Sequence, residues 1–134
     1  MQNFYIIIGP KGVGKNKFVQ YLQEKQNMVP ATDKLNIDEQ DVAIVDIEKV
    51  AGIKRNYNGN KEIKVCGLFC SDKEFLLRNN KEDLDEESRK ELKRFWGSDL
   101  MCNVYLNVEN YETEDMLHNR LLKWILWEEE YTEN

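Results

Sequence analysis

The sequence predicts an α/β fold in which a parallel sheet of about four strands is flanked by helices in three layers. One observation is an alternation along the chain, because four short apolar runs are each followed by a segment of helical periodicity. Such alternation is typical of a parallel sheet covered on both faces. A second observation is size, since 134 residues with 41% hydrophobic content suffice for one core. We therefore expect a single domain over residues 1–134.

The expected elements follow from these runs and from helix signals beside them. The strands extend from Asn3 to Ile8, Val42 to Ile47, Ile63 to Phe69 and Val104 to Val108. The helices extend from Lys15 to Lys25, Glu48 to Arg55, Asp72 to Asn79, Glu86 to Phe95 and Glu112 to Glu129. Ser71 and Asp85 directly precede the third and fourth helices, where they are expected N-caps. Residues 26–40 are mostly polar and contain Pro30, which indicates a loop or short flap.

The last expected helix is more apolar than a single buried stripe requires. Most of its apolar side chains are expected to pack in the core. The surplus, especially Trp124 or Trp127, has two interpretations that stay open at this stage. It is either plain burial or a surface for a homodimer or another partner.

Composition excludes several classes of function. A formal charge of −6 and a pI near 4.9 argue against broad binding to nucleic acid or to an anionic membrane. No apolar run has the length of a membrane span and no signal peptide is evident, so we expect a cytoplasmic protein. Cys66, Cys70 and Cys102 lack paired spacing and are expected to be buried, reduced thiols. His118 is expected at the surface, and one histidine gives little support for a zinc site.

The strongest functional signal directly follows the first strand. The sequence there reads Gly9, Pro10, Lys11, Gly12, Val13, Gly14, Lys15. Glycines at these positions allow successive backbone N–H groups to surround an anion, and Lys15 reaches the outer phosphates. The next helix directs its positive end to the same place. This predicts a phosphate-binding loop (P-loop, Walker A) for a nucleoside triphosphate; the alternative is a tight turn with a solvated lysine.

The residues next to the loop bear on magnesium. Asn16 stands where a Ser or Thr hydroxyl would be expected to help hold Mg²⁺, and Lys17 follows it. An Asn carbonyl oxygen is an alternative hard ligand, and Lys11 adds a second cation to the loop. We therefore expect positions 9–17 to bind the nucleotide, with Asn16 as a candidate metal ligand.

Asp46 is the second candidate for the metal. It falls at the end of the expected second strand, beside the loop strand, where a carboxylate can hold a magnesium-bound water near the phosphates. Its alternative role is to cap the next helix. Glu48 is a weaker candidate because it is expected to face the helix surface.

The order of these motifs resembles guanylate kinase, a nucleoside monophosphate kinase whose loop commonly reads Gly-Pro-Ser-Gly-x-Gly-Lys. The segments that carry the resemblance are Gly9 to Lys15, Val42 to Glu48 with Lys54 and Arg55, Val65 to Arg78, Asp85 to Ser88, and Asn103 to Asn110. The resemblance implies ATP as the ligand and Arg78 as a cation at the entry to a lid over residues 78–88. It also implies phosphoryl transfer to a small acceptor, with Lys15, Arg78 and Asp46 as the catalytic residues.

Two departures from that family pattern stand out. Residues 26–41 replace the subdomain that binds the monophosphate acceptor, and the part from 26 to 40 has no arginine or tyrosine. Leu92 stands where the family has a lid arginine, and Arg89 and Arg94 flank it on different helix faces. The leading hypothesis is an ATP-binding, guanylate-kinase-like phosphotransferase. The alternative is a catalytically degenerate nucleotide-sensing or protein-interaction module.

Overall fold

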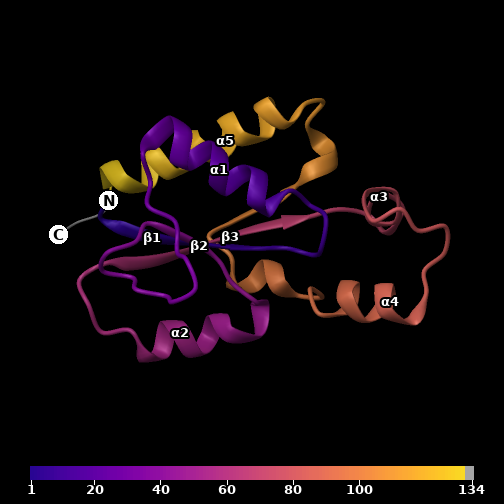
Figure 1. Cartoon of the computed structure of the whole chain (residues 1–134), viewed down its shortest axis with the longest axis horizontal. Coiled ribbons are helices and arrows are strands. Elements are labelled where there is room, and N and C mark those ends of the chain that lie inside the picture. Colours follow the sequence, from indigo (N-terminus) through magenta and orange to yellow (C-terminus); the bar gives the residue numbers. More distant parts are fainter. Residues whose placement is uncertain (132–134) are drawn as a thin grey trace.

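The protein is an α/β structure built on one four-stranded parallel sheet, as a computed structural model that describes residues 1–131 shows (Figure 1). The strand order is β2-β1-β3-β4. The strands are β1 (Asn3–Ile8), β2 (Val42–Ile44), β3 (Glu62–Phe69) and β4 (Val104–Asn107). The helices are α1 (Lys15–Gln26), α2 (Val50–Asn56), α3 (Asp72–Arg78), α4 (Glu86–Lys93) and α5 (Glu114–Tyr131). Three 3₁₀ helices add η1 (Ile47–Lys49), η2 (Ser98–Met101) and η3 (Val108–Asn110).

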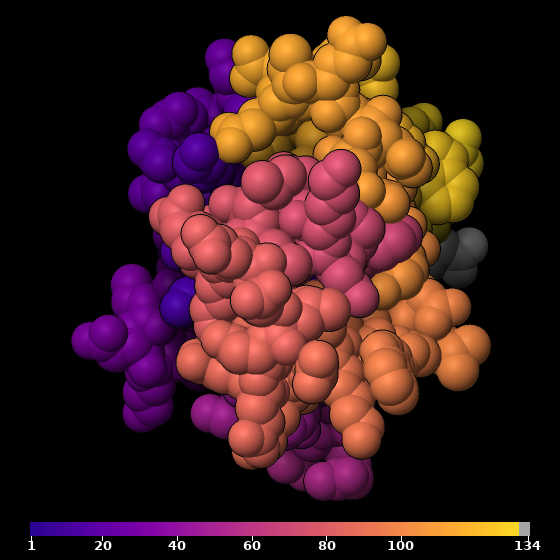
Figure 2. Space-filling model, turned by 90° about the vertical axis from the view of Figure 1, so that its right-hand side faces the viewer, coloured from indigo at the N-terminus to yellow at the C-terminus, as the bar shows by residue number. Residues whose placement is uncertain are grey.

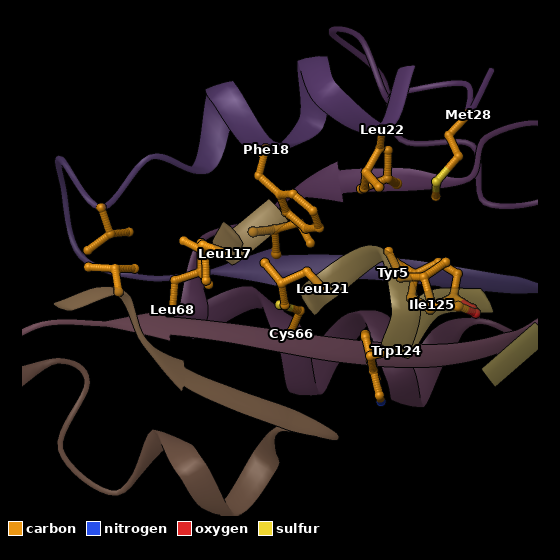
Figure 3. Close-up of a cluster of buried hydrophobic side chains, with 14 residues drawn as sticks. Tyr5, Phe18, Leu22, Met28, Cys66, Leu68, Leu117, Leu121, Trp124 and Ile125 are labelled. Carbon is orange, nitrogen blue, oxygen red and sulfur yellow. The ribbon is translucent and has the colours of Figure 1, made fainter. Parts of the chain in front are cut away.

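Helices cover both faces of the sheet, which confirms the expected three-layer arrangement. In Figure 1, α1 and α5 lie above the sheet, whereas α2 and α4 lie below it. Figure 3 shows Phe18 and Leu22 of α1 meeting Leu121 and Ile125 of α5 over the strands. On the other face, Val50 and Ile47 pack with alternate residues of β1. This alternation is what a strand buried on both faces requires.

Strand β1 lies at the centre of this arrangement. All six of its residues are buried, and it pairs in parallel with β2 on one side and β3 on the other. Ile6, for example, is in register with Ala43 and Val65. Because the strands are parallel, their carboxyl ends meet at one edge of the sheet. The segments that leave β1, β2 and β3 therefore start close together.

The predicted second strand is too long. It ends at Ile44, because Asp46 accepts a hydrogen bond from the backbone N–H of Glu48 at 3.0 Å and so begins η1. Ile47 is buried in that 3₁₀ helix rather than in the strand. Short apolar runs do not distinguish a strand from a buried helical turn, which explains the error. The remaining predicted boundaries agree with the structure or differ from it by at most two residues.

The structure corrects one prediction about α5 and decides between two interpretations of another residue. His118 is buried rather than at the surface, with an exposed fraction of 6%, and its ring packs against Phe18 and Tyr21. Burial lowers the pKa of this imidazole. Trp124 is also buried and stands edge-on to Tyr5, which agrees with the plain-burial interpretation that the sequence left open. Trp127 remains 53% exposed.

The cysteine prediction is correct in part. All three thiols are free, and Cys66 is buried, but Cys70 and Cys102 are only half-buried. Within the described residues 1–131, no helix combines the length and apolar character needed to cross a membrane.

After α1 ends at Gln26, residues 27–41 form a loop that returns along the outer side of β2. Pro30 makes an isolated parallel bridge to Val42, and the N–H of Ala31 donates to the Val42 carbonyl at 2.8 Å. The Asp41 carboxylate accepts from the N–H of Val29 at 2.8 Å and closes the loop. The predicted flap is thus fixed to the edge of the sheet.

The amino end of β1 is tied to the last turns of α5 by one carboxylate. Glu129 accepts hydrogen bonds from the backbone N–H groups of Gln2 at 2.8 Å and Asn3 at 3.1 Å. It also accepts from the Asn3 side-chain amide at 2.7 Å and from the Tyr5 hydroxyl at 2.9 Å. Burial raises the pKa of Tyr5, and the hydrogen bond to Glu129 raises it further, so the phenol stays protonated and donates.

Candidate functional site

The site begins with the glycine loop, defined here as Gly9 to Lys15, between β1 and α1. Gly9 is buried, and a Cβ atom there would stand 2.6 Å from the Leu68 carbonyl oxygen and 2.9 Å from Val13 Cγ2. Gly12 and Gly14 have φ angles of 89° and 97°, a region that favours glycine. Each of the three glycines therefore has a physical reason to be glycine.

Other residues fix the loop to the core and to α1. Pro10 is buried, and Val13 inserts its side chain into the cluster formed with Phe18. Gly14 is the N-cap of α1 and has no side chain to bond the first N–H groups of that helix. The amino end of α1 therefore offers free donor groups beside the loop.

Lys15 curls back over the loop. Its Nζ donates to the Gly9 carbonyl oxygen, and the side chain is half-buried. Burial lowers the pKa of this lysine, Arg94 lowers it further, and the charges of Glu91 and Asp46 act in the opposite direction. The ammonium thus lies within electrostatic reach of both carboxylates.

A cavity of about 650 Å³ lies against the glycine loop. Its lining residues are Lys11, Gly12, Gly14, Lys15, Asn16, Lys17, Ile44, Arg78, Glu91 and Glu114. Four of these carry a positive charge and two a negative charge at neutral pH. The cavity thus favours an anion although the chain as a whole carries −6.

Helix α3 brings two side chains to the loop. Arg78 donates from Nη1 to the Gly12 carbonyl at 3.2 Å and from Nε to Glu74 at 2.9 Å. Asn79 donates to the Lys11 carbonyl at 3.0 Å. The sequence prediction placed Arg78 near the loop, and the structure brings it there. Asn79 had no role in that prediction.

Asp46 lies at the same end of the sheet but outside the lining of this cavity. Its carboxylate accepts from the Glu48 N–H and pairs with the Arg94 guanidinium. The Glu48 N–H, and then the Arg94 charge, lower the pKa of Asp46. Asp46 therefore performs the predicted alternative role of a cap, while its charge also acts on Lys15.

Arg94 and Glu91 are the residues that sequence reasoning left unassigned or missed. Arg94 donates from Nη1 to Glu91 at 2.8 Å and lies 3.5 Å from Glu48. Glu91 in turn accepts from the backbone N–H of Lys11 at 2.9 Å. Arg89 lines a different cavity with Leu92 and Trp96. The sequence could show only that Arg89 and Arg94 face different sides, and this is correct.

The two remaining predicted positions, Asn16 and Lys17, have different contacts. Asn16 is exposed and lines the cavity, so it is available to a ligand. Lys17 points toward α5, where its Nζ pairs with Glu114 at 3.0 Å. Within residues 1–131, no group of three or more His, Cys, Asp or Glu side chains is arranged to hold a metal ion.

A second cavity of about 520 Å³ lies between α3 and α4 and shares Lys11, Arg78 and Glu91 with the first. In Figure 2, which faces this end of the molecule, the pink and salmon residues of α3 and its connection to α4 cover the centre of the surface. That connection, the predicted lid region, contains no helix or strand from Asn79 to Asp85. The candidate site therefore lies between the glycine loop and these two helices.

Comparison with known proteins gives no assignment. The chain matches no protein-family model, and the curated proteins include no significant match to it.

Proposed function

We propose that the protein binds a nucleoside triphosphate on the glycine loop, with ATP as the expected ligand, and transfers its γ-phosphoryl group to a small acceptor. One observation carries the proposal: a buried strand leads through three glycines and Lys15 into a helix whose amino end has no side-chain cap. This is the arrangement that a phosphate group requires, because backbone N–H groups and a lysine converge on one space.

The volume and charge of the adjacent cavity support this ligand. About 650 Å³ is within the range of small-molecule sites, and the cationic lining offsets phosphate charge. Lys15 has a lowered pKa through burial, and its ammonium would be stabilised again by a bound phosphate. The finer part of the predicted fold, a P-loop nucleotide-binding domain, belongs to the same proposal.

The roles proposed for the three candidate catalytic residues follow from their positions. Lys15 and the loop amides would neutralise charge on the transferred group, and Arg78 would add a second cation from α3. Phosphoryl transfer depends on such positioning and electrostatics rather than on a covalent group of the protein. The resemblance to guanylate kinase in motif order supports the same assignment.

The donor set fits a magnesium ion held mainly by phosphates and water. Mg²⁺ in nucleotide sites usually takes only one or two protein oxygens and keeps several waters. Asn16 offers an exposed side-chain oxygen in the cavity lining, and Asp46 is a carboxylate near enough to act on Lys15. Asn16 would bind the ion directly and Asp46 would hold one of its waters. The ion would supply charge neutralisation at the phosphates.

A nucleotide-sensing module that does not turn over is the second candidate. It is favoured by the short loop at residues 26–41, which lies along β2 and does not form a separate acceptor-binding sheet. It is also favoured by the pairing of Asp46 with Arg94, which holds the candidate magnesium residue away from the cavity lining.

The first test is thermal unfolding with and without magnesium-ATP and magnesium-GTP. Ligand at about one hundred times its Kd stabilises the protein by about 2.7 kcal/mol, or roughly 10 °C in Tm for this size. Lys15→Ala should abolish the shift. Lys25→Ala is the matched control, because Lys25 is an exposed lysine in the last turn of the same helix. A shift that survives Lys15→Ala would refute the loop assignment.

The second test separates the enzyme from the sensor. With γ-labelled ATP and a panel of small acceptors, the enzyme requires label on one acceptor and loss of transfer in Asp46→Asn. Binding that depends on Lys15 without transfer to any acceptor would favour the sensor.

A further inference from the structure

The side chain of Glu91, which belongs to α4, accepts a hydrogen bond from the glycine loop. Oε2 accepts the hydrogen bond of the Lys11 backbone N–H at 2.9 Å, and Oε1 accepts from Arg94 Nη1 at 2.8 Å. Glu91 is a residue of α4, eighty positions along the chain from Lys11. A carboxylate thus uses a backbone donor of the loop whose geometry suits an anion.

The Glu91 carboxylate and a ligand phosphate would compete for the same donor groups of the glycine loop. Both are anionic acceptors, and both are attracted by loop N–H groups and by Lys15. The charge of Glu91 already acts on Lys15, since it opposes the lowering of the lysine pKa by burial. A phosphate that entered while Glu91 stayed in place would face a like charge at close range, which is unfavourable.

We propose that Glu91 is an internal anion that occupies the glycine loop of the ligand-free protein and is displaced from Lys11 by the phosphates of the ligand. This inference rests on the proposed function, because it assigns a regulation to that same site. Ligand entry is thereby coupled to a movement of Glu91 and of the helix that carries it.

The way α4 is attached permits this movement. Among the described residues, no side chain of Glu86–Lys93 belongs to either buried hydrophobic cluster. The contacts of α4 with the loop end of the sheet are polar: Glu91 with Lys11, and the following Arg94 with Asp46 and Glu48. The nearest apolar contact is that of Phe95, beyond the end of the helix, with the second cluster. Elements held by few buried apolar contacts open at low free-energy cost.

Displacement would also change the shape of the site. Glu91 lines both the cavity on the glycine loop and the cavity between α3 and α4. If its side chain left Lys11, one of the three residues shared by the two cavities would no longer stand between them. A triphosphate beside Arg78, which lines both cavities, would then also have access to Lys81 of the second.

The substitution Glu91→Gln tests the proposal because it removes the charge and keeps an oxygen that can accept from Lys11. Calorimetric titration with magnesium-ATP, and separately with inorganic tripolyphosphate, should show Kd lowered roughly fivefold to tenfold relative to wild type. Glu86→Gln is the matched control. It removes the same charge from the same helix, where Glu86 is exposed and pairs only weakly with Lys90 at 3.7 Å. It should change Kd less than about twofold.

A second readout needs no ligand. Hydrogen exchange of the Lys11 amide should be roughly tenfold faster in Glu91→Ala than in wild type, because the carboxylate that accepts its hydrogen bond is gone. The Ser88 amide, bonded to Asp85 at 2.8 Å on the same helix, reports whether α4 has unfolded. Unchanged exchange at Lys11 would refute the internal anion even if nucleotide binds.

The two proposals fail in different ways. Binding that depends on Lys15, with equal or weaker affinity in Glu91→Gln, refutes the internal anion and leaves the proposed function intact. Binding in Glu91→Gln but not in wild type supports both proposals. No binding in either protein refutes the proposed function and, with it, the displacement of Glu91 by a ligand.

Discussion

A glutamate from a helix contacts the amino end of β1, another contacts the loop that follows its carboxyl end, and the two differ in the number of hydrogen bonds that they accept. At the amino end, Glu129 accepts four hydrogen bonds, two of them from backbone N–H groups. At the carboxyl end, Glu91 accepts one backbone N–H and shares its other oxygen with Arg94. The same residue type, glutamate, therefore makes four hydrogen bonds at one end of the strand but only one to the backbone beyond the other. The amino end is thus fixed by more hydrogen bonds than the loop end, where we propose that Glu91 is displaced by a ligand.

Replacing each of these glutamates by glutamine gives the largest expected effect and the most direct test of the contrast. Glu129→Gln should lower the free energy of unfolding by about 3 kcal/mol, because the amide loses the charge and one acceptor oxygen and turns an N–H donor toward a donor of Gln2, Asn3 or Tyr5. This corresponds to a Tm lower by roughly 12 °C. Glu91→Gln should change stability by less than about 0.5 kcal/mol.

Urea unfolding of both variants measures this contrast. Glu130→Gln, an exposed neighbour of Glu129, should stay close to wild type. Equal losses in Glu129→Gln and Glu91→Gln would mean that both ends of β1 are structural, and would remove the basis for a loop end that opens.

The second prediction concerns the backbone at the carboxyl end. Gly9→Ala should destabilise the protein by about 2 kcal/mol, because the new methyl group would meet the Leu68 carbonyl oxygen at 2.6 Å. Gly52→Ala in α2 is the control. Its Cβ would find only the end of the Arg55 side chain at 3.7 Å, and alanine favours a helix.

Thermal melts of Gly9→Ala and Gly52→Ala measure this difference in stability. If Gly9→Ala melts with wild type while Gly52→Ala does not, the strand-to-loop junction is looser than its packing indicates. The contrast between the ends would then extend to the backbone.

The smallest expected effect is the acid dependence of the Asp46 contact with Arg94. Asp46→Asn keeps a side-chain cap for η1 but loses the attraction to Arg94, which in an exposed pair costs about 0.5 kcal/mol. Because folding lowers the pKa of Asp46, this contribution is present above the unfolded value of about 3.9 and is lost as the pH falls through the folded value.

Unfolding at pH 7 and at pH 3 measures that dependence. The difference between wild type and Asp46→Asn should shrink at the lower pH. A constant difference would show that the charge of Asp46 adds nothing to stability and that Arg94 is held by Glu91 and Glu48.

Local patterns in the sequence were enough for most of the fold. The continuous apolar run of β1 and the caps at Ser71 and Asp85 act on neighbouring residues, and the structure has the run as a strand and both caps in place. The end of β2 was wrong because Asp46 competes with strand pairing through its own side chain. His118 was wrong because the helix face that meets Phe18 depends on how α5 packs.

In the candidate site, too, local features could be predicted from the sequence and long-range contacts could not. The positions of Gly9, Gly12 and Gly14 follow from conformation within one turn, so their spacing in the sequence was informative. The contact of Glu91 with Lys11 joins residues eighty positions apart and depends on where α4 lies. Glu91 is one of three glutamates in α4, and nothing in the neighbouring sequence marks it for such a role.

The loop that returns along β2 has a consequence for association between chains. An edge strand offers unpaired backbone groups to any other extended chain, a common route to aggregation. Here Pro30 lies beside Val42, and Ala31 already uses the Val42 carbonyl. Proline has no N–H with which to continue a ladder. The short segment at residues 26–41 thereby protects the sheet on this side against growth into intermolecular β-structure.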